Sequence, residues 1–166
     1  MSVMDVIRRR YSCRKFAGRP VEEEKLRQIL EAGRLAPTAA NNQQNRHVLV
    51  TDRAFVTEMV TACNGQKWIE TAPAILVECS VGDRPMPCGH SARCTDSAIA
   101  LSFMYLTAVD LGLQGCWIGN FDPSRVRQAL SLPENWEVFD VMPIGYPGDD
   151  GHPREKKPLE ELAVIR

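Results

Sequence analysis

The sequence predicts an α+β protein in which helices and strands are mixed within one domain. Apolar residues recur at helical spacing in several segments, and short apolar runs typical of strands lie between those segments. The order of these elements shows no regular βαβ alternation, which favours an α+β layer architecture. A chain of 166 residues fits one domain over 1–166 and can bury most of the surface that its unfolded form exposes.

The first two elements are predicted to be amphipathic helices. The first is capped by Ser2 and ends in the basic run of residues 8–10, because basic side chains suit the C-terminal end of a helix. The second begins in the acidic residues 22–24 and stops near Pro37. A polar loop, residues 38–45, leads on to the next element.

The middle of the chain alternates between strands and helices. The hydrophobic pattern predicts strands over 47–51 and 74–79 and a helix over 55–62 between them. Residues 81–94 contain several glycines and prolines, so we expect a loop or lid there. Lids of this kind often cover ligands.

The most apolar helix is expected over residues 96–111, with Asp96 as its N-terminal cap and Gly112 as its C-terminal stop. We expect this helix to lie at the centre of the core. The elements after it are a short strand or turn at 115–119, a helix opened by Asp122 and Pro123 and ended by Pro133, a strand at 136–144, and a tail at 145–158 rich in glycine, proline and charge.

Composition limits the classes of function. The formal net charge is -1, which argues against a nucleic-acid binder that uses its whole surface. No apolar run approaches the roughly 20 residues that a membrane helix requires, and no signal peptide begins the chain. Six cysteines in such a chain are expected to be reduced thiols. We therefore expect a cytoplasmic protein that binds neither nucleic acid nor membrane.

The first candidate site follows the first helix. Arg10, Ser12 and Arg14 would share one face of an extended segment and present two guanidinium groups and a hydroxyl to a phosphate or polyol. A solvated basic surface is the competing interpretation. Further cations, Arg154 and Lys156, lie in the tail, where they either complete a phosphate site or belong to an exposed charged terminus.

The second candidate site is the amide-rich loop that follows the second helix. It offers hydrogen-bond donors and acceptors that suit the edge of a flavin pyrimidine or a ribityl chain, although many loops are simply polar. Its candidate binding residues are Pro37, Thr38, Ala39, Asn41 and Gln43.

The combination of these segments with residues 115–123 resembles the nitroreductase family along nearly the whole chain. The resemblance implies a mixed, mainly antiparallel sheet flanked by helices, an intertwined homodimer and an FMN cofactor. It makes Arg10 a phosphate ligand, Ser12 a nearby flavin contact, and Arg14 the cation beside the N1/O2 edge of the flavin ring. Gln44 and Asn45 replace the Pro-Trp pair that ends the family's loop motif.

The same resemblance assigns the remaining flavin contacts. Trp117, Ile118 and Gly119 would line the flavin, with a backbone N–H near N5, the atom that receives hydride. Arg154 and Lys156 would hold the phosphate. The mid-chain polar contacts of the family could correspond to Asn64, Gln66 or Lys67, and the local spacing does not choose among these three.

The function implied is an NAD(P)H-dependent flavin oxidoreductase that works by a ping-pong mechanism. NAD(P)H would deliver hydride to flavin N5 and leave, and a small conjugated acceptor such as a nitroaromatic or a quinone would then take its place. No protein side chain needs to act as a nucleophile, so no catalytic residue is assigned. The resemblance selects neither the physiological acceptor nor NADH over NADPH.

The alternative is a non-catalytic flavin- or metal-binding redox sensor. Cys88, His90 and Cys94 lie close together in the sequence, and Cys79 could be a fourth ligand for zinc. Their spacing is not that of paired CxxC ligands, so no metal site is predicted. The enzyme is favoured because a sensor needs no open face over the flavin, whereas the lid-like residues 81–94 indicate one.

Overall fold

A four-stranded sheet forms the middle layer of the molecule. In the computed structural model, which describes residues 2–166, the strands lie in the order β1-β2-β4-β3 and every neighbouring pair is antiparallel. This arrangement confirms the predicted α+β class with a mainly antiparallel sheet. The strands are β1 (Asn45–Val50), β2 (Ala74–Ser80), β3 (Gln114–Gly115) and β4 (Glu137–Gly145).

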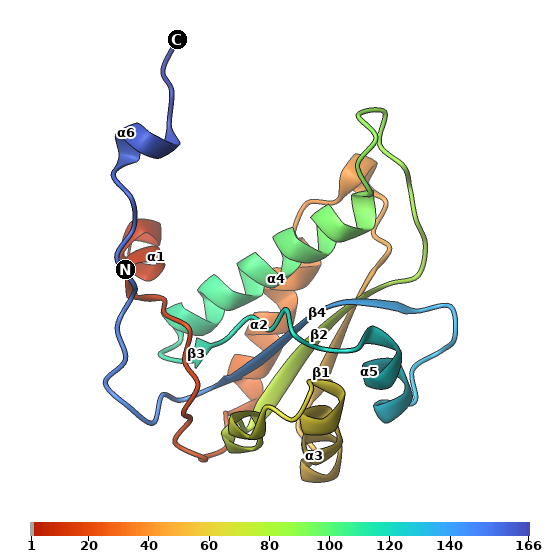
Figure 1. The fold of residues 1–166 in the computed structure, drawn as a ribbon, viewed down its shortest axis with the longest axis vertical. Helices are drawn as coiled ribbons and strands as arrows, with labels where there is room; N and C mark the ends of the chain where they lie inside the picture. The colour runs from red at the N-terminus through yellow and green to blue at the C-terminus, as the bar shows by residue number, and fades with distance from the viewer. Residues whose placement is uncertain (1) are drawn as a thin grey trace.

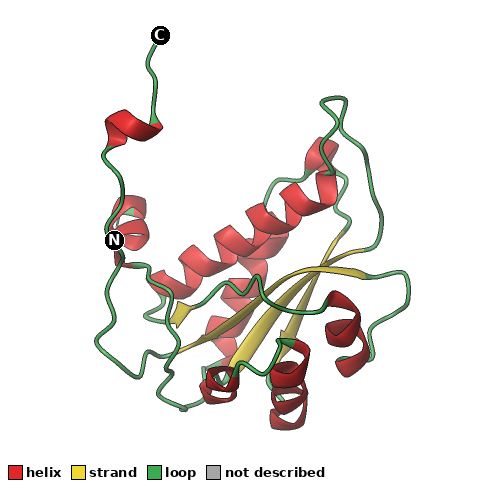
Figure 2. Cartoon of the chain, in the orientation of Figure 1, coloured by secondary structure: helices red, strands yellow, loops and turns green. Residues whose placement is uncertain are grey.

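Helices cover both faces of this sheet (Figure 1). On one face, α2 (Glu23–Leu35) and α4 (Ala92–Asp110) pack in an apolar cluster that includes Leu76 of β2. On the other face, α3 (Arg53–Ala62) and α5 (Pro123–Ala129) pack against Val77. Figure 2 shows the short helical elements near the chain ends and in the connections, namely α1 (Val3–Arg9), η1 (Ala39–Asn41), η2 (Lys67–Thr71) and α6 (Leu159–Leu162).

Most of the predicted helix ends are confirmed by their capping contacts. Ser2 caps α1 by accepting a hydrogen bond from the N–H of Asp5 at 3.2 Å. Asp122 caps α5 by accepting from the N–H of Ser124 at 2.9 Å. Gly112 follows α4 with φ +83°, a conformation that favours glycine. The short elements η2 and α6 were not predicted, because with five and four residues they are too short to show a repeating helical pattern.

The central helix α4 begins earlier than its sequence pattern predicts. It starts at Ala92 rather than at residue 96, so the prediction that Asp96 caps it is wrong. Asp96 lies in the second turn and is only 4% exposed, and its carboxylate accepts a hydrogen bond from the N–H of Ala39 at 3.0 Å. The polar start of the helix hides its periodicity, and the acidic side chain binds a distant loop instead of its own helix end. None of the helices within residues 2–166 has the length and apolar character required to cross a membrane.

A row of polar side chains crosses the sheet. His47, Glu78 and Asp140 are lateral partners on β1, β2 and β4. Glu78 shares a face with Leu76, two residues earlier, and therefore points toward the layer of α2 and α4. One Glu78 oxygen lies 2.7 Å from Nδ1 of His47, and the other oxygen is buried without a hydrogen-bond partner among the described residues.

Burial gives Glu78 an unusual affinity for its proton. Its side chain is fully buried, and this desolvation raises its pKa from the ordinary value of 4.5 to about 7. The hydrogen bond and charge of His47 lower the pKa, and the neighbouring Asp140 raises it, but both effects are smaller than that of burial. The folded protein therefore binds this proton more tightly than the unfolded chain does.

Glu78→Gln is expected to change how stability depends on pH. Because the folded-state pKa is raised, unfolding releases a proton between pH 4.5 and about 7, and wild-type stability falls as pH rises through that window. A shift from 4.5 to about 7 corresponds to roughly 3 kcal/mol. Glutamine does not titrate. The free energy of unfolding of the variant, relative to that of the wild type, should therefore increase as pH rises through the same window.

Urea denaturation of both proteins at several pH values measures this difference, with the exposed Glu160→Gln as the control. A difference between Glu78→Gln and wild type that stays constant with pH would contradict the raised pKa.

Candidate functional site

The two ends of the chain meet at the β3–β4 edge of the sheet. Ser12 pairs with Gly115 in a parallel bridge, and Phe16 pairs with Pro147 in an antiparallel one. The N–H of Cys13 donates to the carbonyl of Gly115 at 3.0 Å. The segment after α1 is thereby held extended beside the segment after β4, although more than a hundred residues separate them in the sequence.

Two glycines allow the chain ends to approach this closely. A Cβ atom at Gly151 would lie 2.0 Å from the Tyr11 ring, and one at Gly148 would lie 2.8 Å from the backbone of Phe16. The Tyr11 hydroxyl donates to a carboxylate oxygen of Asp149 at 3.3 Å. The aromatic ring of Tyr11 therefore fits against the tail only because residue 151 has no side chain.

The sequence-predicted site residues of the two chain ends line one cavity between these segments. We call this cavity of about 410 Å³ the cation pocket. Asp149 supplies a single carboxylate to its lining, against four permanent cations, so the pocket attracts anions. The structure brings together here all five of the sequence-predicted residues from the two chain ends, Arg10, Ser12, Arg14, Arg154 and Lys156.

A second cavity of about 340 Å³ adjoins the cation pocket. Arg10 and Ser12 line both cavities, and the exposed ring of Trp117 forms a wall of the second one. The remaining wall comes from α4, through Ser102, Tyr105 and Leu106. The sequence analysis missed Ser102 and Tyr105. Their spacing of three residues places two hydroxyls on one face of the apolar middle part of α4, and this signal could have identified them.

Tyr105 connects the walls of the two cavities. Its hydroxyl lies 2.5 Å from the carbonyl oxygen of Tyr11 and 2.6 Å from that of Gly115. Burial raises the pKa of the Tyr105 hydroxyl, and the nearby Arg10 lowers it by less, so this group stays protonated and acts as a donor. The central helix thus fixes the N-terminal segment and β3 at once.

The segment after β3 contributes unequally to the site. Ile118 is buried in the cluster under α3 and α5, and its N–H donates to the carbonyl of Val141 at 2.9 Å. Trp117 is exposed on the other side, and a Cβ atom at Gly119 would meet no atom within 4 Å. Trp117 and Gly119 therefore face open space, whereas Ile118 anchors them to the sheet.

Two of the mid-chain candidates support this same segment. The side chain of Asn64 donates to the side-chain oxygen of Asn120 at 2.8 Å. The Gln66 amide donates to the Asn120 carbonyl at 2.9 Å. Lys67 begins η2 and shares in neither contact. Asn64 and Gln66 thus fix the backbone that follows Gly119.

The amide-rich loop has a strained backbone. Ala40, Asn41 and Gln43 have φ values of 51°, 54° and 51°, in the left-handed region that residues other than glycine rarely occupy. The Thr38 hydroxyl holds this conformation by accepting from the N–H of Gln43 at 3.1 Å. Clusters of such residues occur at functional sites, where the surrounding structure maintains them. Composition alone predicts a polar loop and does not reveal this geometry.

Within one chain, this loop does not reach the cation pocket. The contact between Ala39 and Asp96 anchors it at the start of α4, whereas Tyr105 lines the second cavity more than two turns further along that helix. This separation amounts to roughly 13 Å along the helix axis. Figure 1 shows the loop before β1 beside the start of α4, with α1 beside the other end. Pro37, Thr38, Ala39, Asn41 and Gln43 therefore form a surface apart from the five residues of the pocket.

The candidate metal ligands do not assemble. Cys79 lies inside β2 under α3, where burial raises its pKa to about 12, while Cys88 and Cys94 are exposed. Across residues 2–166, no group of three histidine, cysteine, aspartate or glutamate side chains gathers to hold a metal ion. Cys94 belongs to α4 and His90 to the preceding loop, so their closeness in the sequence does not make a site.

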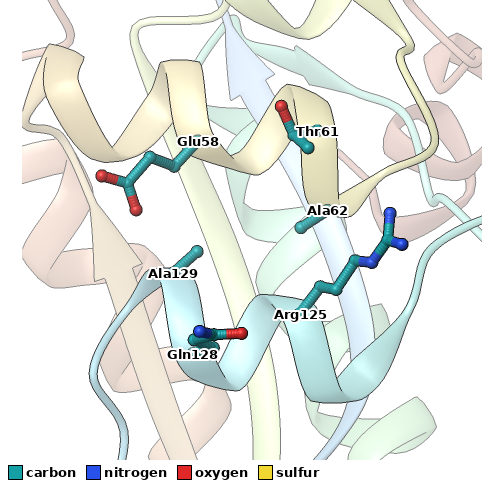
Figure 3. Close-up of a pocket in the computed structure, with 6 residues that line it drawn as sticks. All are labelled: Glu58, Thr61, Ala62, Arg125, Gln128 and Ala129. Atoms are coloured by element: carbon teal, nitrogen blue, oxygen red, sulfur yellow. The ribbon is translucent and has the colours of Figure 1, made fainter.

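A groove of about 530 Å³ lies between α3 and α5, away from these residues. Figure 3 shows that the carboxylate of Glu58 and the guanidinium of Arg125, on its two walls, point away from each other. The groove offers no convergent polar groups of the kind that fix a ligand's orientation. The cation pocket with its adjoining cavity remains the candidate site.

Comparison with known proteins agrees with this assignment. A sequence model of the nitroreductase family matches residues 7–81 and 51–146. A protein of Thermus thermophilus named NADH dehydrogenase is 31% identical in an alignment that covers 95% of this chain and 93% of the relative. An FMN reductase of Bacillus subtilis, named as using NAD(P)H, is 28% identical over 91% of this chain and 68% of its own length.

The fold agrees as well. The crystal structure of a nitroreductase family protein from Clostridium difficile superimposes with a TM-score of 0.85 at 30% identity, covering 99% of this chain and 98% of that one. Because the family match spans most of the sequence and the whole fold superimposes, the chain belongs to the nitroreductase family.

Proposed function

We propose that this protein is an FMN-dependent oxidoreductase that transfers hydride from NAD(P)H to a small conjugated acceptor. The observation that carries the proposal is the cation pocket, which joins a cavity walled by an exposed tryptophan ring. The first space suits a phosphate and the second an aromatic ring. The names of the relatives, which include NADH dehydrogenase and FMN reductase, support the same chemistry.

The residues present fit the phosphate of FMN. A phosphate monoester carries a charge of about -1.5 to -2 near neutral pH and accepts several charge-assisted hydrogen bonds. Arg10, Arg154 and Lys156 would hold it, with the Ser12 hydroxyl as a further donor. Arg154 and Lys156 are exposed, so a phosphate could reach them from solvent.

The remaining residues would act on the ring. When bound, FMN would supply a site that accepts hydride from NAD(P)H and returns it to the acceptor. Arg14 would stabilise negative charge at the N1/O2 edge, and Trp117 and Gly119 would line the ring. In the proposed ping-pong mechanism, donor and acceptor would use the same face of the ring in turn, and no side chain would need to form a bond to substrate.

A second copy of the chain would complete the site. The amide-rich loop lies too far from the cation pocket of its own chain, so we assign its flavin contacts to the partner in a homodimer. Apolar side chains on α1 are left exposed, with Val3 at 70% and Met4 at 51%, and Ile165 at the tail is fully exposed. Such side chains could be buried against the partner in this dimer.

The direct test of the function is anaerobic addition of NADH or NADPH to the FMN-loaded protein. The flavin absorbance should bleach with at least one nucleotide and recover when a quinone or nitroaromatic is added. Flavin that neither nucleotide bleaches would refute the oxidoreductase and favour a binding protein.

The cation pocket predicts a preference for FMN over riboflavin. Lys156→Gln should weaken FMN binding by about tenfold or more, because it removes a charge-assisted hydrogen bond worth about 1.5–3 kcal/mol. Riboflavin binding should hardly change. Lys157→Gln is the matched control, since Lys157 lies outside the pocket lining and pairs with Glu161 at 3.1 Å.

Equilibrium titration with FMN and with riboflavin measures both affinities. Equal affinity of the wild-type protein for the two flavins would show that the pocket holds no phosphate.

Arg14 and Arg154 are expected to affect the flavin differently. A guanidinium beside N1/O2 stabilises the negatively charged reduced flavin more than the neutral oxidised one, so Arg14→Gln should lower the reduction potential. Arg154→Gln should instead weaken FMN binding about equally in both redox states, because the charge of the phosphate does not change on reduction.

Potentiometric titration with FMN kept saturating separates the two effects. The assignment of the arginines is wrong if Arg14→Gln leaves the potential unchanged, or if Arg154→Gln shifts it by as much.

A further inference from the structure

The indole of Trp117 is tied at its polar edge to the sheet. Its Nε1–H donates to a carboxylate oxygen of Asp140, at 2.8 Å, while its ring lines the second cavity. The side chain is 37% exposed and belongs to none of the three apolar clusters of the described residues. At Gly119, two residues further on, a Cβ atom would meet nothing within 4 Å. Packing therefore does little to fix the orientation of this ring.

Asp140 is itself well fixed. It lies on β4 beside its lateral partner Glu78, which is bound in turn to His47 on β1. Burial raises the pKa of Asp140, and the hydrogen bond from Trp117 lowers it by less. The acceptor for the indole thus sits on β4 at the end of the polar row, next to an irregularity where the pairing with β2 shifts by one residue.

Burying the polar row of His47, Glu78 and Asp140 costs desolvation free energy, so stability alone does not explain why these residues are polar. Two neighbouring carboxylates are buried or half-buried, and one oxygen of Glu78 is left without a partner among the described residues. Apolar residues at these positions would avoid such desolvation. A role in orienting a side chain at the site accounts for keeping the carboxylate of Asp140.

We propose that Asp140 is a positioning residue that holds the Trp117 indole as a fixed wall of the second cavity. A hydrogen bond to a charged acceptor favours the tied orientation over the alternatives by about tenfold or more. The consequence of this positioning rests on the proposed function: the fixed wall sets the space left for a planar aromatic acceptor. Asp140 does not itself line the second cavity and acts through Trp117, which does.

Two substitutions separate the hydrogen bond from the charge. Asp140→Asn keeps an oxygen that can accept from the indole, whereas Asp140→Leu has a similar size and no acceptor. Each is compared with the same variant carrying Trp117→Phe, because the difference between the two emission spectra isolates Trp117 from Trp68 and Trp136. The emission of those other two tryptophans should be unaffected and serves as the internal control for folding.

Acrylamide quenching of the flavin-free protein is the primary measurement. Asp140→Leu should raise the quenching constant of Trp117 about twofold and lower its anisotropy, because a released indole swings into solvent. Asp140→Asn should stay close to wild type in both. Quenching and anisotropy unchanged in Asp140→Leu, with the other tryptophans as in wild type, would overturn the proposal. If Asp140→Leu does not fold, an Asp140→Ser variant, too short to reach the indole, replaces it with the same expectation.

Titration with FMN distinguishes this proposal from the proposed function. Flavin bound against the indole should quench Trp117 emission strongly in the wild-type protein and in Asp140→Asn. A protein in which FMN leaves Trp117 emission unchanged, while Asp140→Leu still raises acrylamide quenching, would keep Asp140 as the positioning residue and remove the flavin from this cavity. In the loaded enzyme, Asp140→Leu should raise the KM for the acceptor several-fold, with a smaller effect on kcat.

Discussion

The site depends on the hydroxyl of Tyr105. This buried group on the central helix lies between the carbonyl oxygens of Tyr11 and Gly115, and so joins the N-terminal segment to α4 and β3, which lie about ninety residues or more away from it in the sequence. Arg10 and Ser12 flank one of these carbonyls, and Trp117 follows the other by two residues. The cation pocket and the adjoining cavity share a wall because one helix holds both segments in register.

The sheet supplies the second constraint. Its apolar residues pack helices on both faces, but at one end the row of His47, Glu78 and Asp140 replaces them with polar groups. Burial of this row lowers stability, and its last member, Asp140, holds the Trp117 indole at the site. Burial raises the pKa of Glu78 to about 7, so below that pH its proton reduces the repulsion that Asp140 would otherwise meet while it holds the indole.

Local patterns in the sequence were enough to predict most of the helices and strands, because capping residues and apolar spacing located α1, α2, α5 and the longer strands. The prediction that the cations of both chain ends share a phosphate site came instead from the resemblance to the family, and the structure places these cations in one cavity. Contacts between distant residues could not be predicted. Asp96 has the sequence signature of a cap but binds Ala39, and Gly151 makes room for Tyr11 in a way that only the folded structure reveals.

The central claim is that both ends of one chain hold the flavin phosphate while a second copy supplies the amide-rich loop. A crystal structure of the protein grown with FMN tests it most directly. The phosphate should lie within hydrogen-bonding distance of Arg10 and Lys156 of one chain, with the partner's Thr38 to Gln43 segment against the flavin. FMN bound in the groove between α3 and α5, or held by a single chain without its partner's loop, would contradict it.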